Sequence, residues 1–365
     1  MRRPAIILAA ALAIGAITGL MVHQHTRSTL MNDAFTRLNL YHDLRKATLE
    51  DYMRSKASDV IAMSRNARVL DALGKFESAW SKIPSDAATV VRRLYIEDNP
   101  SPEGRKRDLR SASDESEYTE VHAPFHDWAR RFLEHFGYYD LFLIDRRGNI
   151  IYTVEKEDDF ATNLNDGPYA DSPLGSVFQR ALKSKAERAI ISDYERYAPS
   201  KDAPALFAGC AIRTKDGDVA GIFAVQLPAD PINAILRFTG GMGKTGETYI
   251  VGNDETMRSQ SRFSTESTLL KTKVATASVS QGLAGFRGNH VIPDYRGVPV
   301  LSVFSPVDFG GPPWVLLAEI DEAEVLARMK LWPAIVAALI AAGLSAFLCY
   351  LALGVLLPHS SRGRT

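Results

Sequence analysis

The sequence predicts an α+β fold in which a long N-terminal helix precedes two tandem modules of helices and strands, flanked by two transmembrane helices. Two uncharged apolar stretches lie near the two ends of the 365-residue chain, and a long segment without proline follows the first of them. From residue 137 onward, short runs rich in β-branched and aromatic residues alternate with turn residues, in two successive blocks.

The two apolar stretches run from Pro4 to Val22 and from Leu331 to Leu357, and both reach the length of about 20 residues that a membrane-spanning helix needs. The first could instead be a signal peptide, but its apolar core exceeds the roughly 7–15 residues of a cleaved signal, which favours an uncleaved anchor. Arg2 and Arg3 precede the first stretch, and Arg362 and Arg364 follow the second. By the positive-inside rule, both ends are cytoplasmic and the main domain is periplasmic, in a two-pass protein of the inner membrane.

The segment from Ser28 to about Ile83 predicts one long helix. It contains no proline, and no glycine before Gly74, and its apolar residues mostly recur at steps of three, four or their sums. The seam through Leu38, Tyr41, Leu49 and Tyr52 suits packing on the protein's own modules. The same seam suits pairing with a second copy or with a related receptor, and the pattern does not decide between the two.

A connecting loop and a helix from Tyr118 to Phe136 complete the stalk region, residues 24–136. The first module, residues 137–228, follows. Its expected strands are Tyr139–Asp145, Ile150–Val154, Ala189–Ser192, Ala205–Arg213 and Val219–Gln226, with a helix from Pro173 to about Lys185. Ser172 is the expected N-cap of that helix, because Pro173 suits its first position.

The second module, residues 229–330, begins with a short helix from Asp230 to Phe238. Its expected strands are Glu247–Val251, His290–Ile292, Val298–Phe304 and Trp314–Ile320. A helical segment from Asp321 to Lys330 is expected to lead into the second membrane span, residues 331–357, after which a short tail, 358–365, is expected to be cytoplasmic.

The stretch from Gly240 to Thr245 resembles a phosphate-binding loop, but its context is wrong. The motif needs another glycine where Phe238 stands, and it needs a helix after the loop. The residues that follow, Thr248 to Val251, are β-branched or aromatic and predict a strand, which offers no helix N-terminus to an anion. We therefore interpret this stretch as a glycine turn that starts a strand.

Several other classes of function are disfavoured. Lysine plus arginine and aspartate plus glutamate both number 43, so no basic excess points to nucleic acid. His122 and His126 are four residues apart, but Pro124 lies between them and no third metal ligand is evident. No serine-hydrolase elbow or zinc-protease motif occurs. We expect neither enzymatic activity, nor a metal, nor a cofactor.

The chain resembles the double-Cache sensor region of bacterial methyl-accepting chemotaxis receptors and related transmembrane signal transducers. The stretches that carry this resemblance are Leu94–Pro100, Gly137–Leu164, Gly167–Leu182, Ile191–Ile212, Thr245–Phe263, Asp294–Ser302 and Trp314–Val325. The resemblance implies two tandem PAS-like (Cache) modules, one far from the membrane and one near it. It also implies an extracytoplasmic sensor of small molecules in signal transduction, most typically in chemotaxis.

The sequence departs from that family in two respects. Related receptors continue after the second span into a cytoplasmic output domain, whereas only a short tail follows Pro358 here. The alternative is therefore an accessory or decoy subunit, or a receptor fragment. The Arg-x-Trp-Tyr signature of amino-acid-binding members is also missing, so the resemblance implies no amino-acid ligand.

A sensor pocket is expected to be mostly apolar with a few convergent polar groups. In the membrane-distal module, the residues expected to bind a small polar ligand are Tyr152, Lys156, Asp159, Tyr169, Asp171, Asp193, Tyr194 and Tyr197. Glu157 and Asn165 lie in the same segments. Tyrosines with polar tips and side chains of opposite charge would suit a small polar or zwitterionic molecule. The alternative is that Lys156 belongs to a solvated run of charges and that the tyrosines are core residues.

Overall fold

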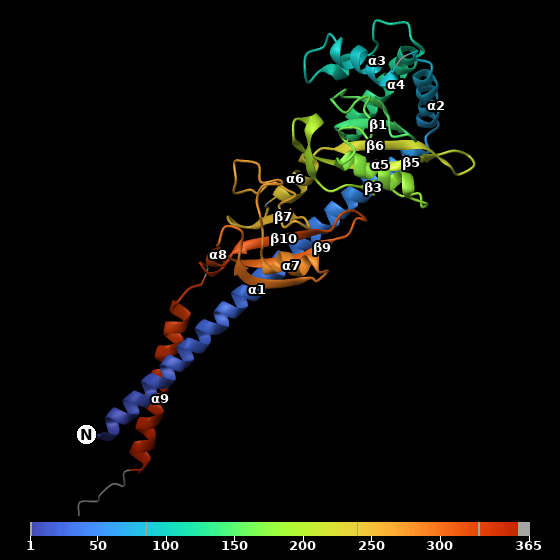
Figure 1. Cartoon of the computed structure of the whole chain (residues 1–365). Coiled ribbons are helices and arrows are strands. Elements are labelled where there is room, and N and C mark those ends of the chain that lie inside the picture. Colours follow the sequence, from blue (N-terminus) through green and yellow to red (C-terminus); the bar gives the residue numbers. More distant parts are fainter. Residues whose placement is uncertain (1, 85, 239, 328, 357–365) are drawn as a thin grey trace, which may run out of the picture.

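In the computed structural model, one helix runs from the apolar N-terminal segment past both modules (Figure 1). The structure describes residues 2–84, 86–238, 240–327 and 329–356. Two antiparallel sheets follow one another along this helix. The predicted α+β fold, with a long N-terminal helix, two tandem modules and a long apolar helix near each end, is confirmed.

The long helix, α1 (Arg2–Ser64), is shorter at its far end than predicted. The chain breaks at Asn66, whose side chain accepts a hydrogen bond from the backbone N–H of Arg68 and caps a separate helix, α2 (Ala67–Ser81). Asparagine is among the best N-cap residues, because its side chain replaces a missing intrahelical acceptor. The prediction of a single helix to Ile83 is therefore wrong.

The apolar seam of α1 packs on the protein's own sheets. Leu38 and Leu49 are buried, and α1 contacts β9 and β10 of the membrane-near module and then β5 and β6 of the distal one. Leu40 and Leu44, one turn apart, lie on another face and are 68% and 54% exposed. Of the two uses open to the seam, the structure thus shows packing within the chain.

The distal sheet has the strand order β2-β1-β6-β5-β3, with β4 paired to β5, and all its pairs are antiparallel. Its strands are β1 (Asp140–Asp145), β2 (Ile150–Thr153), β3 (Ile190–Ile191), β4 (Glu195–Tyr197), β5 (Ala203–Arg213) and β6 (Val219–Leu227). The helices α2 and α4 (Glu117–Phe136) pack against β1 and β2, whereas α1 and α5 (Pro173–Lys183) pack against β5 and β6. The expected cap is present, since the Ser172 side chain accepts from the Gly175 N–H.

A long connection joins α2 to α4 over the top of the distal sheet (Figure 1). It contains α3 (Ala87–Arg92), a π-helical turn (Arg93–Glu97) and a 3-10 turn (Lys106–Asp108). The other described residues of the connection form no further helix or strand up to Ser116, whose side chain caps α4.

The membrane-near sheet has the order β7-β10-β9-β8, again all antiparallel. Its strands are β7 (Glu247–Val251), β8 (Gly288–Pro293), β9 (Pro299–Val307) and β10 (Trp314–Asp321), and its helices are α6 (Asp230–Arg237), α7 (Ala277–Leu283) and α8 (Glu322–Leu326). The segment from Gly240 to Thr245 leads into β7, so a strand and not a helix follows it, as predicted. The helix expected to reach Lys330 ends at Leu326.

Both apolar segments are helical, and both helices are long and apolar enough to cross a membrane. The second is α9 (Trp332–Leu356). A side chain at Gly15 of α1 would meet the Ala338 carbonyl at 2.7 Å and the Ala342 methyl at 2.9 Å, so the two helices approach closely there. Small residues such as glycine and alanine at a contact between helices allow close packing in lipid. The tail 358–365 lies outside the described residues.

Candidate functional site

A fully buried lysine marks the most unusual polar site of the distal module. Lys156 follows β2, has the rare positive φ of 56°, and is 0% exposed. Its ammonium lies 3.3 Å from the Val154 carbonyl oxygen and 3.4 Å from each ring nitrogen of His126. It forms no ion pair with a carboxylate among the described residues. Burial lowers the pKa of Lys156 to about 7, although Asp140 and Glu155 partly oppose this.

His126 is held in one tautomer beside this lysine. Its Nε2 is 2.7 Å from the Arg107 carbonyl oxygen, which only accepts, so Nε2 carries the proton. Its Nδ1, 2.8 Å from the Tyr152 hydroxyl, therefore accepts from that group. Burial and the charge of Lys156 lower the pKa of His126 to about 3, so this imidazole is neutral. The bond to Arg107 also anchors the long connection over the sheet.

Lys156 lines a cavity of about 100 Å³ that opens to solvent. Loop residues from three places form it: the long connection (Glu103, Gly104, Lys106), the start and end of the β1–β2 hairpin (Tyr139, Glu155, Lys156, Glu157, Asp158) and the turn after β4 (Pro199, Lys201). Such a volume suits a molecule of a few heavy atoms.

The four carboxylates around the cavity already have partners. Glu103 pairs with Lys201 at 2.9 Å, and Glu155 pairs with Arg107 at 2.9 Å. In the same way, Asp158 pairs with Arg92 at 3.0 Å, while Glu157 accepts from Tyr139 and Ser200, both at 2.7 Å. The acids are thus occupied, whereas the one fully buried cation of the cavity wall lacks an acid.

A second buried group lies next to this site. Asp159 is 0% exposed, and its Oδ2 accepts a hydrogen bond of 2.6 Å from the Tyr197 hydroxyl. Its Oδ1 has no hydrogen-bond partner among the described residues. Burial raises the pKa of Asp159 to about 7, against the lowering effect of Tyr197.

The structure brings together part of the predicted site. Tyr152, Lys156, Asp159 and Tyr197 all lie in this region of the distal module, and the ring of Tyr169 lies 6.3 Å from that of Tyr197. Asp171 is exposed and lines a different surface hollow, beside α5.

Asp193 and Tyr194 lie elsewhere, at the contact between the two modules. Both oxygens of Asp193 accept from Arg258 of the membrane-near module, at 2.9 Å each, and Oδ1 also accepts from the Trp314 indole at 2.8 Å. The Tyr194 ring is stacked on Trp314, with 6.0 Å between centroids and 5° between planes. Neither residue lines the cavity beside Lys156.

Some residues of the site were not singled out from the sequence. Tyr139 and Ser200 fix Glu157, and Arg107 holds both His126 and Glu155. His126 was considered only as a metal ligand. Among the described residues, no group of three or more His, Cys, Asp or Glu could hold a metal ion. The available signal in the sequence was the four-residue spacing of His122 and His126 on one expected helix, and the structure shows both to be buried and hydrogen-bonded core residues.

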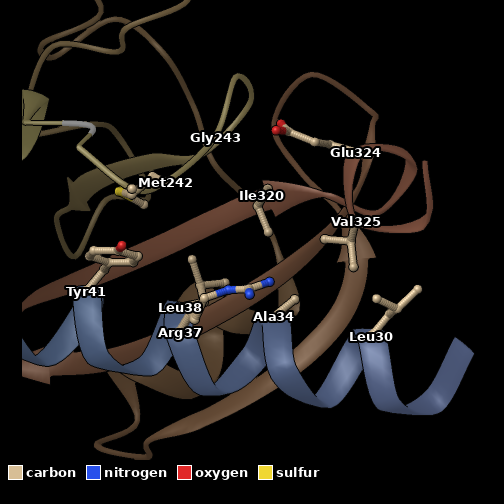
Figure 2. A pocket seen from close by; sticks show the side chains of 11 residues that line it. Leu30, Ala34, Arg37, Leu38, Tyr41, Met242, Gly243, Ile320, Glu324 and Val325 are labelled. Carbon is tan, nitrogen blue, oxygen red and sulfur yellow. The ribbon is translucent and has the colours of Figure 1, made fainter. Parts of the chain in front are cut away.

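A second hollow lies in the membrane-near module, between α1 and the glycine-rich turn (Figure 2). Its cavity volume is only about 40 Å³, and its walls are mostly apolar residues such as Leu38 and Val325, so it has room for little more than water. Glu324 points at the turn, where its carboxylate accepts from the N–H groups of Lys244 and Thr245 at 2.9 and 2.7 Å. The turn that resembles a phosphate loop therefore binds an anion of its own chain.

No protein family model matches the sequence, and no curated protein matches it significantly. Solved structures with a similar arrangement exist. The sensory domain of the Campylobacter jejuni chemoreceptor Tlp3 is 12% identical, with a TM-score of 0.48, and the match covers 84% of this chain and 100% of that one. The sensor domain of the V. cholerae histidine kinase DctB is 14% identical, with a TM-score of 0.45 and coverages of 80% and 98%.

The ligand-binding domain of the Pseudomonas aeruginosa amino acid chemoreceptor PctC, solved with GABA, is 15% identical, with a TM-score of 0.42 and coverages of 78% and 99%. All three are sensory or ligand-binding domains of chemoreceptors or histidine kinases, the class of protein that the sequence resembles. At these identities and TM-scores, the likeness says nothing about the ligand of this chain.

Proposed function

We propose that this protein is a membrane-anchored extracytoplasmic sensor, of the chemoreceptor kind, that binds a small polar organic ligand in its distal module. One observation carries the proposal. Helix α1 is unbroken from Arg2 to Ser64, so the same rigid element includes an apolar segment long enough to span a membrane and packs on both sheets. A change at the distal module can therefore act directly on a helix that enters the membrane.

The ligand site that we propose is the cavity beside Lys156, and the ligand class is a small organic acid. The buried ammonium has no acid partner, and it is the group that an incoming carboxylate would pair with once the cavity wall opens to it, because Lys156 is fully covered in the unliganded protein. Asp159, Tyr197 and Tyr152 do not line the cavity. We propose that they hold the surrounding residues in place, through the bonds of Tyr197 to Asp159 and of Tyr152 to His126. Asp193 and Tyr194 have no part in it.

We also propose that two such chains, or this chain and a related receptor, pair along the stalk. Because Leu38 and Leu49 are buried against the protein's own sheets, the exposed Leu40 and Leu44 offer the contact instead.

The topology is tested with a reporter enzyme that is active only outside the cytoplasm. Fusion after Gly217, in an exposed hairpin turn, is expected to give an active reporter, and fusion after Thr365 an inactive one. The physical reason is the placement of arginines outside both apolar segments. An active reporter at Thr365 would contradict the two-span arrangement.

Ligand binding is tested by the thermal unfolding of the full chain in detergent, against a panel of small organic acids, amines and sugars. At about 100 times its dissociation constant, a ligand is expected to raise the free energy of unfolding by about 2.7 kcal/mol. The expected hit is an organic acid small enough for the cavity. Stabilisation by amines or sugars alone would refute the assignment of the acid class.

A further inference from the structure

A largely buried ion pair connects the two modules, and it lies between the proposed ligand site and β10, the last strand before α8 and α9. Asp193 lies between β3 and β4 of the distal sheet, whereas Arg258 follows β7 of the membrane-near sheet. The two hydrogen bonds, from Nε and Nη2 of Arg258, are both 2.9 Å, so the pair is bidentate. The side chain of Arg258 is only 5% exposed and that of Asp193 20%.

The local structure is built around this pair. A Cβ atom at Gly252 would lie 2.4 Å from the guanidinium carbon of Arg258, so only glycine lets the arginine lie flat on that turn. Asp254 holds another nitrogen of the guanidinium at 2.9 Å. Arg258 is thus fixed from its own side and presents its remaining donors to Asp193. A bidentate arginine held in this way loses little entropy when it pairs.

Asp193 also contacts the strand that leads toward the membrane. Its Oδ1 accepts from the indole N–H of Trp314, the first residue of β10, and the neighbouring Tyr194 stacks on the same indole. β10 continues into α8, and α9 follows. Four residues after Asp193, β4 ends at Tyr197, whose hydroxyl donates a hydrogen bond to Asp159 beside the cavity.

We propose that Asp193, Arg258 and Trp314 form a joint through which a change at Asp159 and Tyr197 alters β10. A role of this joint in signalling rests on the proposed function. The coupling itself can be measured without a ligand. The short segment from Asp193 to Tyr197 has a fixed contact at each end. A shift of Tyr197 therefore displaces Asp193, and the bidentate pair passes that displacement to the membrane-near module.

The test is a double-mutant cycle on the full chain in detergent, measured by hydrogen–deuterium exchange of the β10 amides. Tyr197→Phe removes the hydroxyl that holds Asp159 and serves as the perturbation at the site. In the wild-type background, it is expected to change the exchange of residues 314–321 by about fivefold or more, the lower end of typical coupling between sites. In the Arg258→Gln background, the same substitution is expected to change exchange in β10 much less, because only the contacts of Asp193 and Tyr194 with Trp314 remain.

The matched control is Arg65→Gln. Arg65 also binds a carboxylate, that of Glu187, through two nitrogens, but this pair joins the end of α1 to the distal module and does not involve the membrane-near module. The response of β10 to Tyr197→Phe is expected to persist in this background. Arg258→Lys keeps the charge but not the bidentate geometry, and we expect it to lose most of the response of β10. In this variant, the peptide that covers α5 should exchange as in wild type, which would exclude general unfolding.

Two results would overturn the joint: an absent response of β10 in the wild-type background, or an equal response with and without Arg258. If no compound of the thermal-unfolding panel stabilises the protein, that result counts against the proposed function. It does not bear on the coupling through Arg258.

Discussion

Lys156→Met is expected to make the unliganded protein more stable at pH 6, by on the order of 1–4 kcal/mol. The ammonium is buried without an acid partner, so the folded state carries a desolvation penalty that the unfolded chain does not. Methionine fills a similar volume without a charge. Chemical denaturation measures the difference, and Lys75→Met, at an exposed lysine of α2, is the matched control with little expected change.

The pH dependence of this gain has a definite sign. Burial lowers the pKa of Lys156 from 10.5 to about 7, so between these values the unfolded chain binds more protons than the folded one. Wild-type stability therefore includes a contribution that rises with pH from about 7 to 10.5, and the variant lacks it. The advantage of Lys156→Met should shrink steadily over this range. A constant difference between pH 6 and pH 10 would mean that the ammonium is not desolvated.

The same variant tests the site. Without the ammonium, any organic acid identified by the thermal panel is expected to bind at least about 30-fold more weakly, as when one partner of a buried charge pair is removed. A more stable protein that no longer binds separates this role from damage to the fold. Undiminished binding would place the ligand away from Lys156.

Much of the fold could be predicted because local patterns determine it. Alternating apolar residues and glycine turns at Gly148 and Gly217, both with φ above 90°, located the hairpins of the distal sheet. The end of α1 was missed because Asn66 does not interrupt the apolar period. The Asn66 side chain accepts from the Arg68 N–H and so competes with continuation of the helix, and the spacing of apolar residues does not reveal this. The expected strand Ala189–Ser192 contains β3, whereas the three-residue strand β4 was not predicted because it is too short for a clear pattern.

The site was predicted only in part, because burial of charged residues depends on contacts distant in sequence. Lys156 and Asp158 look alike in a run of charges, yet the first is buried and the second exposed. Asp193 was grouped with the site by its position after a strand. Its partner Arg258 lies 65 residues later in the other module, and no local signal connects the two.

The membrane-near module contains a pair of buried carboxylates that gives it a pH dependence of its own. Glu319 of β10 and Glu247 of β7 are register partners across the two strands, and each is 3% exposed. Glu247 accepts from Ser261, from Tyr295 and from the Arg262 N–H. Glu319 accepts from the Tyr249 hydroxyl at 2.8 Å, and its other oxygen has no hydrogen-bond partner among the described residues.

Burial, with smaller contributions from Asp294 and Glu247, raises the pKa of Glu319 from 4.5 to about 7, against the lowering effects of Ser302 and Tyr249. The folded state therefore holds a proton that the unfolded chain releases between these two values. Stability from this group is present below pH 4.5 and is lost as the pH rises toward 7, an effect of about 3 kcal/mol at 1.4 kcal/mol per pKa unit.

Glu319→Gln is expected to remove this loss, because an amide keeps the carbonyl acceptor for Tyr249 and does not ionise. Relative to wild type, the variant should gain about 3 kcal/mol of unfolding free energy between pH 4.5 and pH 8. Denaturant titrations across this range measure the gain, and Glu266→Gln, at an exposed glutamate of the same module, should show none. Equal slopes for wild type and Glu319→Gln would show that Glu319 is already ionised in the folded protein. Glu319 would then carry its charge in the core, where no cation is its hydrogen-bond partner among the described side chains.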